Sequence, residues 1–139
     1  MIMMRELNLP DRQRFKILVV DDSSMDRDVL IRALKNHGID NEIFQAGNGE
    51  EAMEILSKNY ETIGLICLDW QMPKIDGMEF MRGVVKIPQT ASIPIVMVTA
   101  SSSDEAKNCA KRVNPRLGGY VVKPFGPERL MGVVLPYLS

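Results

Sequence analysis

Short, mostly apolar runs recur five times along the chain, at residues 17–20, 43–46, 65–69, 93–100 and 120–122. An apolar run of this length that ends at a turn signal is typical of a strand covered on both faces, as in parallel sheets. Between the runs, apolar residues recur at helical spacing, so we predict a helix after each strand. Five alternations of strand and helix predict an α/β domain, with a parallel sheet, right-handed crossovers and helices on both faces.

The predicted helices carry start and stop signals. Ser23 or Ser24 can cap the first helix, and Asn48 with Glu51 resembles a capping box at the start of the second. Pro136 is expected to shorten the end of the last helix. The expected apolar stripe of the first helix consists of Met25, Val29, Leu30, Ala33 and Leu34.

A chain of 139 residues is long enough for one domain with a substantial core. We assign residues 1–14, which have mixed charge and no steady apolar period, to an N-terminal tail, and residues 15–139 to the domain. The composition is that of an ordinary globular protein, with 45% hydrophobic residues, 25% charged residues and a formal net charge of −1. It lacks the basic excess of nucleic-acid binders, so we expect no direct contact with nucleic acid.

The apolar runs and the cysteines indicate the cellular compartment. The first residues lack the uninterrupted apolar segment of a signal peptide, and no apolar run approaches the length that spans a membrane. Cys67 lies in an apolar run and Cys109 in a helical pattern, so we interpret both as small core residues rather than disulfide partners. We therefore expect a cytoplasmic protein with no membrane insertion.

Polar side chains end four of the five predicted strands. They are Asp21 and Asp22 after the first strand, Asp69 at the end of the third, Thr99 in the fourth and Lys123 after the fifth. Any one of them alone is more simply explained as a turn residue or a helix cap. Because parallel strands bring their carboxyl ends to one edge of the sheet, however, we expect all of them to lie together at a single site.

The chemistry of this group indicates phosphoryl transfer. Three carboxylates at one edge repel each other, by roughly 4 kcal/mol per pair at a separation of about 4 Å and an effective dielectric constant of about 20. Lys123 supplies one compensating charge and a bound divalent cation would supply two; oxygen ligands without His or Cys favour Mg²⁺ over zinc. A carboxylate beside such a cation, with a lysine and a hydroxyl in reach, can attack a phosphoryl group. We place this nucleophile at Asp69.

Four segments of the sequence match a known family in order and in spacing. They are VVDDS at 19–23, LDWQMP at 68–73 followed by DG at 76–77, IVMVTA at 95–100 and GYVVKPF at 119–125. In these segments the chain resembles the receiver domain of two-component response regulators, in particular the single-domain chemotaxis type. The resemblance extends from Phe15 to about Leu138.

This resemblance implies a flavodoxin-like fold with the strand order 2-1-3-4-5. It also implies that Asp69 is phosphorylated by a histidine kinase or a histidine phosphotransfer protein, and that the signal passes to a downstream protein target. Mg²⁺ would be bound by Asp22, Asp69 and the backbone carbonyl of Gln71, and Asp21 would act mostly through water.

The resemblance also implies roles for residues of the last two strands. Thr99 would bond the phosphoryl group, Lys123 would pair with it, and the rotamer of Tyr120 would follow the state of Thr99. The Lys123–Pro124 peptide bond would be cis. The connection at residues 113–118 is slightly longer than the usual one in the family, so we do not transfer the output partner of any relative to this chain.

We therefore expect a phosphorylation-dependent signalling switch rather than an enzyme. One alternative is that the sequence is the receiver portion of a longer regulator. Another is a phosphatase of the haloacid dehalogenase type, but that fold requires an Asp-x-Asp pair after its first strand, where this chain has adjacent acids. A third is a binding module that has lost phosphorylation, which the presence of all the site residues disfavours.

Overall fold

A parallel sheet of five strands forms the centre of the part of the chain that the structure describes, in the order β2-β1-β3-β4-β5. The computed structural model describes residues 15–72 and 75–138; the tail predicted at 1–14 and two loop residues, 73 and 74, lie outside these ranges. The strands are β1 (Lys16–Val20), β2 (Ile43–Ala46), β3 (Ile63–Leu68), β4 (Ile95–Thr99) and β5 (Gly119–Val122). The strand order confirms the predicted flavodoxin-like α/β fold.

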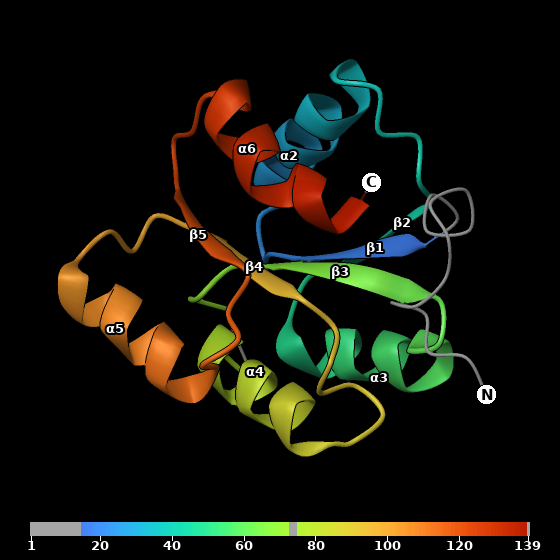
Figure 1. The fold of residues 1–139 in the computed structure, drawn as a ribbon, viewed down its shortest axis with the longest axis vertical. Helices are drawn as coiled ribbons and strands as arrows, with labels where there is room; N and C mark the ends of the chain where they lie inside the picture. The colour runs from blue at the N-terminus through green and yellow to red at the C-terminus, as the bar shows by residue number, and fades with distance from the viewer. Residues whose placement is uncertain (1–14, 73–74, 139) are drawn as a thin grey trace.

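Helices cover both faces of this sheet, and each follows a strand. They are α2 (Ser24–Asn36), α3 (Gly49–Asn59), α4 (Gly77–Lys86), α5 (Asp104–Val113) and α6 (Pro127–Leu138). Figure 1 shows α2 and α6 on one face and α3, α4 and α5 on the other. None of the helices in the described residues is long and apolar enough to cross a membrane.

The central strand β3 is buried at all six positions, because helices lie on both sides of it. Leu65 and Cys67 pack with residues of α2 and α6, whereas Ile66 and Leu68 pack with residues of α3, α4 and α5. Burial raises the pKa of the Cys67 thiol to about 12, as expected of an inert core cysteine. Cys109 is partly buried against the core, and both cysteines are free.

Side-chain caps fix the start of four helices. Ser23, Asn48, Asp76 and Ser103 each accept a hydrogen bond from the backbone N–H three residues further on. Each cap satisfies a donor that the first helical turn leaves without an intrahelical partner. The predicted caps at Ser23 and Asn48 are confirmed, and the loops that leave the carboxyl ends of the strands are held at defined positions.

The buried stripe of α2 is narrower than the sequence predicts. Met25 and Val29 are 74% and 54% exposed, whereas Leu30 and Leu34 are buried. Relative to Leu30, Val29 lies about 100° and Met25 about 140° around the helix, so neither shares the face that meets the sheet. The prediction that both residues belong to the buried stripe is therefore wrong.

The prediction that Pro136 shortens the last helix is also wrong. Helix α6 continues to Leu138 with Pro136 inside it. Two contacts hold this last turn in place: Leu138 is 4% exposed in the core, and the Tyr137 hydroxyl donates to the Gly118 carbonyl at 2.9 Å. Tertiary packing thus outweighs the loss of one helical hydrogen bond at the proline.

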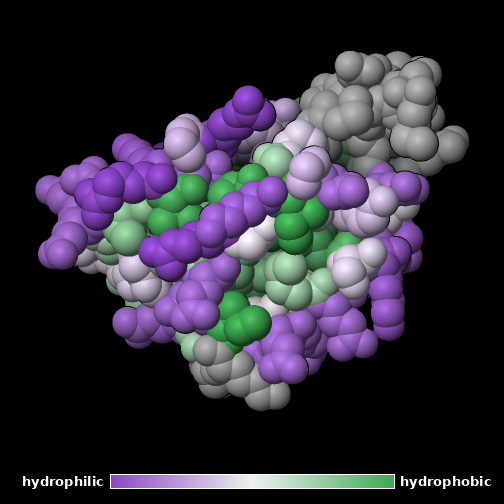
Figure 2. Space-filling model, turned by 90° about the horizontal axis from the view of Figure 1, so that it is seen from below, coloured by the Kyte–Doolittle hydropathy of each residue, from purple (hydrophilic) through white to green (hydrophobic). Residues whose placement is uncertain are grey.

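The face formed by α3, α4 and α5 carries apolar side chains among hydrophilic ones (Figure 2). A cavity of about 220 Å³ is lined by Met53, Leu56, Ser57, Tyr60, Ile87, Gln89 and Thr90. These residues belong to α3 from its middle to its C-cap residue, Tyr60, and to the segment after α4. Because the helices run antiparallel to the strands, the cavity lies toward the amino ends of the strands and contains none of the predicted site residues.

Candidate functional site

Backbone pairing at the carboxyl edge of the sheet brings the predicted site residues together. The Asp69 N–H donates to the Val20 carbonyl at 2.9 Å, which ties the end of β3 to β1. The Lys123 N–H donates to the Thr99 carbonyl at 2.8 Å, which ties the end of β5 to β4. The Lys123–Pro124 peptide bond is cis, as the family resemblance implies.

Three carboxylates cluster at this edge. Asp21, Asp22 and Asp69 each place an oxygen within 4.8 Å of the other two. Asp21 is 6% exposed, the Asp69 side chain is 12% exposed, and Asp22 faces solvent. The donor set consists of oxygen atoms alone and carries negative charge, and these are the properties that a hard divalent cation requires.

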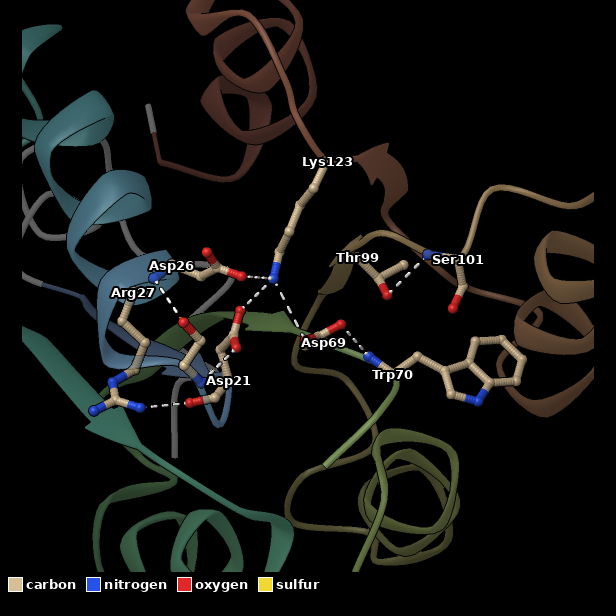
Figure 3. Close-up of polar contacts among 9 residues, drawn as sticks. Asp21, Asp26, Arg27, Asp69, Trp70, Thr99, Ser101 and Lys123 are labelled. Carbon is tan, nitrogen blue, oxygen red and sulfur yellow. Dashed lines mark hydrogen bonds and ion pairs between the residues drawn. The ribbon is translucent and has the colours of Figure 1, made fainter. Parts of the chain in front are cut away.

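The Lys123 ammonium is the positive charge within this cluster (Figure 3). Its Nζ lies 2.6 Å from Asp21 Oδ2, 2.9 Å from Asp26 Oδ2 and 3.4 Å from Asp69 Oδ2. Burial works against the charged form of Lys123, but the bonds to Asp21 and Asp26 and the charge of Asp69 outweigh it, so that the pKa of Lys123 is raised. The ammonium therefore stays charged throughout the physiological pH range.

The charged form of Asp21 is less favourable than that of an ordinary aspartate. Burial raises the pKa of Asp21 above its ordinary value and the neighbouring charge of Asp69 adds to this, while hydrogen bonds from Lys123 and from the Ser23 N–H, at 2.9 Å, oppose it. Burial therefore disfavours the charged form of Asp21, and additional positive charge at this edge would stabilise it.

Helix α2 contributes two residues that sequence reasoning missed. Asp26 reaches Lys123, which is 97 positions away in the chain. Arg27 donates to the Asp21 carbonyl at 2.5 Å and to Gln45 Oε1 at 2.9 Å, and so ties α2 to β2 and to the loop after β1. An acid in the first turn of a helix ordinarily indicates only a favourable interaction with the helix dipole, so the sequence carries no signal for the Lys123 contact.

Thr99 and Tyr120 meet at Ser101. Thr99 is 1% exposed, and its Oγ1 accepts a hydrogen bond from the Ser101 N–H at 3.4 Å. The Tyr120 hydroxyl donates to the Ser101 carbonyl at 2.5 Å, and burial raises the pKa of this phenol. The two predicted switch residues are thus connected through one residue of the loop after β4.

The loop after β3 is packed closely around Asp69. The Trp70 N–H donates to Asp69 Oδ1 at 2.7 Å, and the Trp70 carbonyl accepts from the Gly77 N–H at 2.8 Å. A Cβ atom on Gly77 would overlap the Asp69 carbonyl oxygen and would lie 3.0 Å from Trp70 Cα, so this position requires glycine. Gln71 lies exposed in the same loop, and the metal-binding role of its carbonyl stays a prediction.

The fold and the site define a doubly wound α/β protein with an acidic, lysine-containing carboxyl edge. The family profile of the response regulator receiver domain matches residues 17–135. The chain therefore belongs to this family, whose members are phosphorylation-dependent signalling switches.

Individual relatives agree with this assignment. A chemotaxis protein CheY homolog of Campylobacter jejuni (strain 81-176) is 35% identical over 115 residues, which cover 83% of this chain and 85% of that protein. The structure of Vibrio cholerae CheY4 is 34% identical, covers 89% of this chain and 98% of its own, and superimposes with a TM-score of 0.76. The Mn²⁺-bound form of the response regulator Rcp1 is 26% identical, covers 90% and 95% of the two chains, and has a TM-score of 0.77.

Proposed function

We propose that Asp69 accepts a phosphoryl group from the phosphohistidine of a histidine kinase or a histidine phosphotransfer protein. The protein would then pass the signal to a downstream protein target. The observation that carries this proposal is the position of Asp69 at the end of the central strand, with Oδ2 3.4 Å from Lys123 Nζ. Asp69 is the one carboxylate of the cluster that follows β3 directly and also contacts this lysine.

The transfer forms one bond and breaks one. A carboxylate oxygen of Asp69 attacks the phosphorus, and a P–O bond forms while the P–N bond to the donor imidazole breaks. The imidazole nitrogen keeps the bonding electron pair and takes up a proton from solvent. Lys123, whose raised pKa keeps it charged, would stabilise the phosphoryl oxygens. The Thr99 hydroxyl would donate a hydrogen bond to one of them.

We propose Mg²⁺ as the cofactor, held by Asp22, Asp69 and the Gln71 carbonyl, with Asp21 bound through water. The oxygen atoms of the acidic cluster, within 4.8 Å of each other, support this choice because Mg²⁺ prefers oxygen ligands. The Mn²⁺ in the structure of Rcp1 also supports a divalent cation. When bound, the cation would neutralise charge on the carboxylates and on the phosphoryl oxygens.

On this proposal the protein is a switch without a separate substrate to turn over. The family match to residues 17–135 disfavours the haloacid dehalogenase alternative. The class of phosphoryl donor, the existence of a downstream protein target and the cytoplasmic location stay predictions.

Acetyl phosphate, which donates its phosphoryl group without a kinase, tests the proposal. Intact wild-type protein incubated with acetyl phosphate and Mg²⁺ should gain the mass of one phosphoryl group. Asp69→Asn and a sample with excess chelator should gain none, whereas Asp40→Asn, which changes an exposed acid, should behave as wild type. A wild-type protein that gains no mass, or an Asp69→Asn protein that gains as much, would contradict the proposal.

A further inference from the structure

Three carboxylates already surround the three N–H donors of the Lys123 ammonium. An ammonium group carries three protons, and three carboxylates surround this one, with contacts of 2.6 Å to Asp21, 2.9 Å to Asp26 and 3.4 Å to Asp69. If Lys123 is to pair with a phosphoryl group on Asp69, its bonding must be rearranged. The long 3.4 Å contact to Asp69 passes to the phosphoryl group itself, but a closer approach of the ammonium requires Asp21 or Asp26 to weaken or lose its hydrogen bond.

Asp21 and Asp26 differ in how readily they can release Lys123. The side chains of Asp21 and Asp69 are 8% and 12% exposed, whereas that of Asp26 is 43% exposed. A carboxylate that already faces water is rehydrated at the lowest cost in free energy when its ion pair opens. Asp21 is also fixed by the Ser23 N–H, at 2.9 Å from its Oδ1. Asp26 is therefore the partner that the phosphoryl group would displace.

The backbone of Asp26, in contrast, does not move away easily. Its N–H donates to the cap oxygen of Ser23 at 3.1 Å, and the next residue, Arg27, anchors the helix to the Asp21 carbonyl. After the ion pair opens, the negative charge of Asp26 stays close to the ammonium and to the new phosphoryl oxygens. This charge would attract the ammonium and repel the phosphoryl oxygens.

We propose that Asp26 is a positioning residue that holds Lys123 in the unphosphorylated protein and competes with the phosphoryl group for it. Asp26 thereby weakens the phosphorylated state and shortens its lifetime. This inference rests on the proposed phosphorylation of Asp69. It assigns to the first turn of α2 a role in setting the duration of the signal.

Binding of beryllofluoride, an anionic mimic of the phosphoryl group, tests the inference at equilibrium. We would titrate it with Mg²⁺ present and follow the emission of Trp70, whose N–H contacts Asp69 Oδ1. Asp26→Asn removes the competing charge and should bind beryllofluoride roughly three- to tenfold more tightly. This range is expected because the Asp26 carboxylate is partly exposed and lies 2.9 Å from Lys123 Nζ. Asp28→Asn is the matched control, because it removes the same charge from an exposed position of the same helix and should bind as wild type.

Three further measurements distinguish competition for Lys123 from a structural effect. Asp26→Glu restores the carboxylate and should return the affinity toward the wild-type value. In wild-type protein, the side-chain carboxyl carbon of Asp26 should shift in the NMR spectrum on beryllofluoride binding, as it loses Lys123. After acetyl phosphate is removed, phosphorylated Asp26→Asn should also lose its phosphoryl group several-fold more slowly than wild type.

If wild type binds beryllofluoride but Asp26→Asn binds it equally or more weakly, the inference is overturned while the proposed function stands. If Asp28→Asn tightens binding as much as Asp26→Asn does, general charge and not the Lys123 contact is responsible, and the inference is again overturned. A wild-type protein that binds no beryllofluoride would overturn the proposed function together with this inference.

Discussion

Thr99 and Tyr120 bond opposite ends of the same residue, Ser101. Thr99 Oγ1 accepts from the Ser101 N–H at 3.4 Å, and the Tyr120 hydroxyl donates to the Ser101 carbonyl at 2.5 Å. The first bond is long and therefore weak, whereas the second is short. A Thr99 hydroxyl that turns toward a phosphoryl group would thus release the Ser101 N–H at little cost and leave the loop free to move with Tyr120.

This relationship predicts that Thr99→Ala separates phosphorylation from the response. The variant should still accept a phosphoryl group on Asp69, because the carboxylate and Lys123 are unchanged. Backbone amide shifts on phosphorylation, measured by NMR, should then stay near Asp69 and not extend to Tyr120 and α6. Shifts that spread as far as in wild type would show that Thr99 is not the relay.

The buried phenol of Tyr120 predicts a loss of stability at alkaline pH. Its pKa is raised by burial and by the charge of Asp69, above an ordinary value of 10.0. Its contribution to stability is fully present below the unfolded pKa and is lost as the pH rises through the folded pKa, since the folded state then holds a proton that the unfolded state has released. Tyr120→Phe should reduce the fall in urea midpoint above pH 10.0. Equal pH dependence in the two proteins would contradict this assignment.

Gly77 should be intolerant of a side chain because an added Cβ would overlap the backbone of Asp69, the proposed phosphoryl acceptor. Gly77→Ala forces the loop after β3 away from Asp69, and overpacking of this kind costs about 1–3 kcal/mol. Urea unfolding should show this loss together with weaker Mg²⁺ binding. Gly132→Ala, exposed in α6 with nothing within 4 Å of the added Cβ, is the control. It should gain about 0.5–1 kcal/mol from helix propensity.

The acidic cluster predicts a response of Trp70 to Mg²⁺. Cation binding by Asp22 and Asp69 should order the loop that carries Trp70 and change its emission with saturation. Asp22→Asn should weaken the affinity by at least about tenfold, since even the loss of a partner of a metal ligand costs that much. The distant Asp40→Asn should leave the affinity unchanged. A wild-type titration that is flat in both fluorescence and calorimetry would remove the metal site.

The sheet and the position of the site could be predicted from the sequence because both follow from rules that act along the chain. A strand such as β3, buried at all six positions, leaves a continuous apolar run, and its carboxyl end is marked by Asp69. Parallel pairing then requires that Asp21, Thr99 and Lys123 end at the same edge. The shared edge follows from topology, so no side-chain geometry is needed.

The details that could not be predicted depend on contacts between distant parts of the chain. Asp26 meets Lys123 only because α2 begins directly over the carboxyl end of β1, which periodicity does not reveal. Pro136 is tolerated in α6 because Leu138 and Tyr137 hold the last turn against the domain. The exposure of Met25 depends on which narrow stripe of α2 meets the sheet, and that is decided by packing rather than by hydrophobicity alone.

The most direct test of the central claim is the chemical identification of the phosphorylated residue. Borohydride reduces an aspartyl phosphate to homoserine, so that peptide mapping by mass spectrometry after reduction marks the acceptor position. Protein treated with acetyl phosphate and Mg²⁺ should show homoserine at position 69 and at no other acid, and Asp69→Asn should show none. Homoserine at Asp21 or Asp22, or a phosphoryl group that survives hydroxylamine on Ser101 or Ser102, would contradict the account.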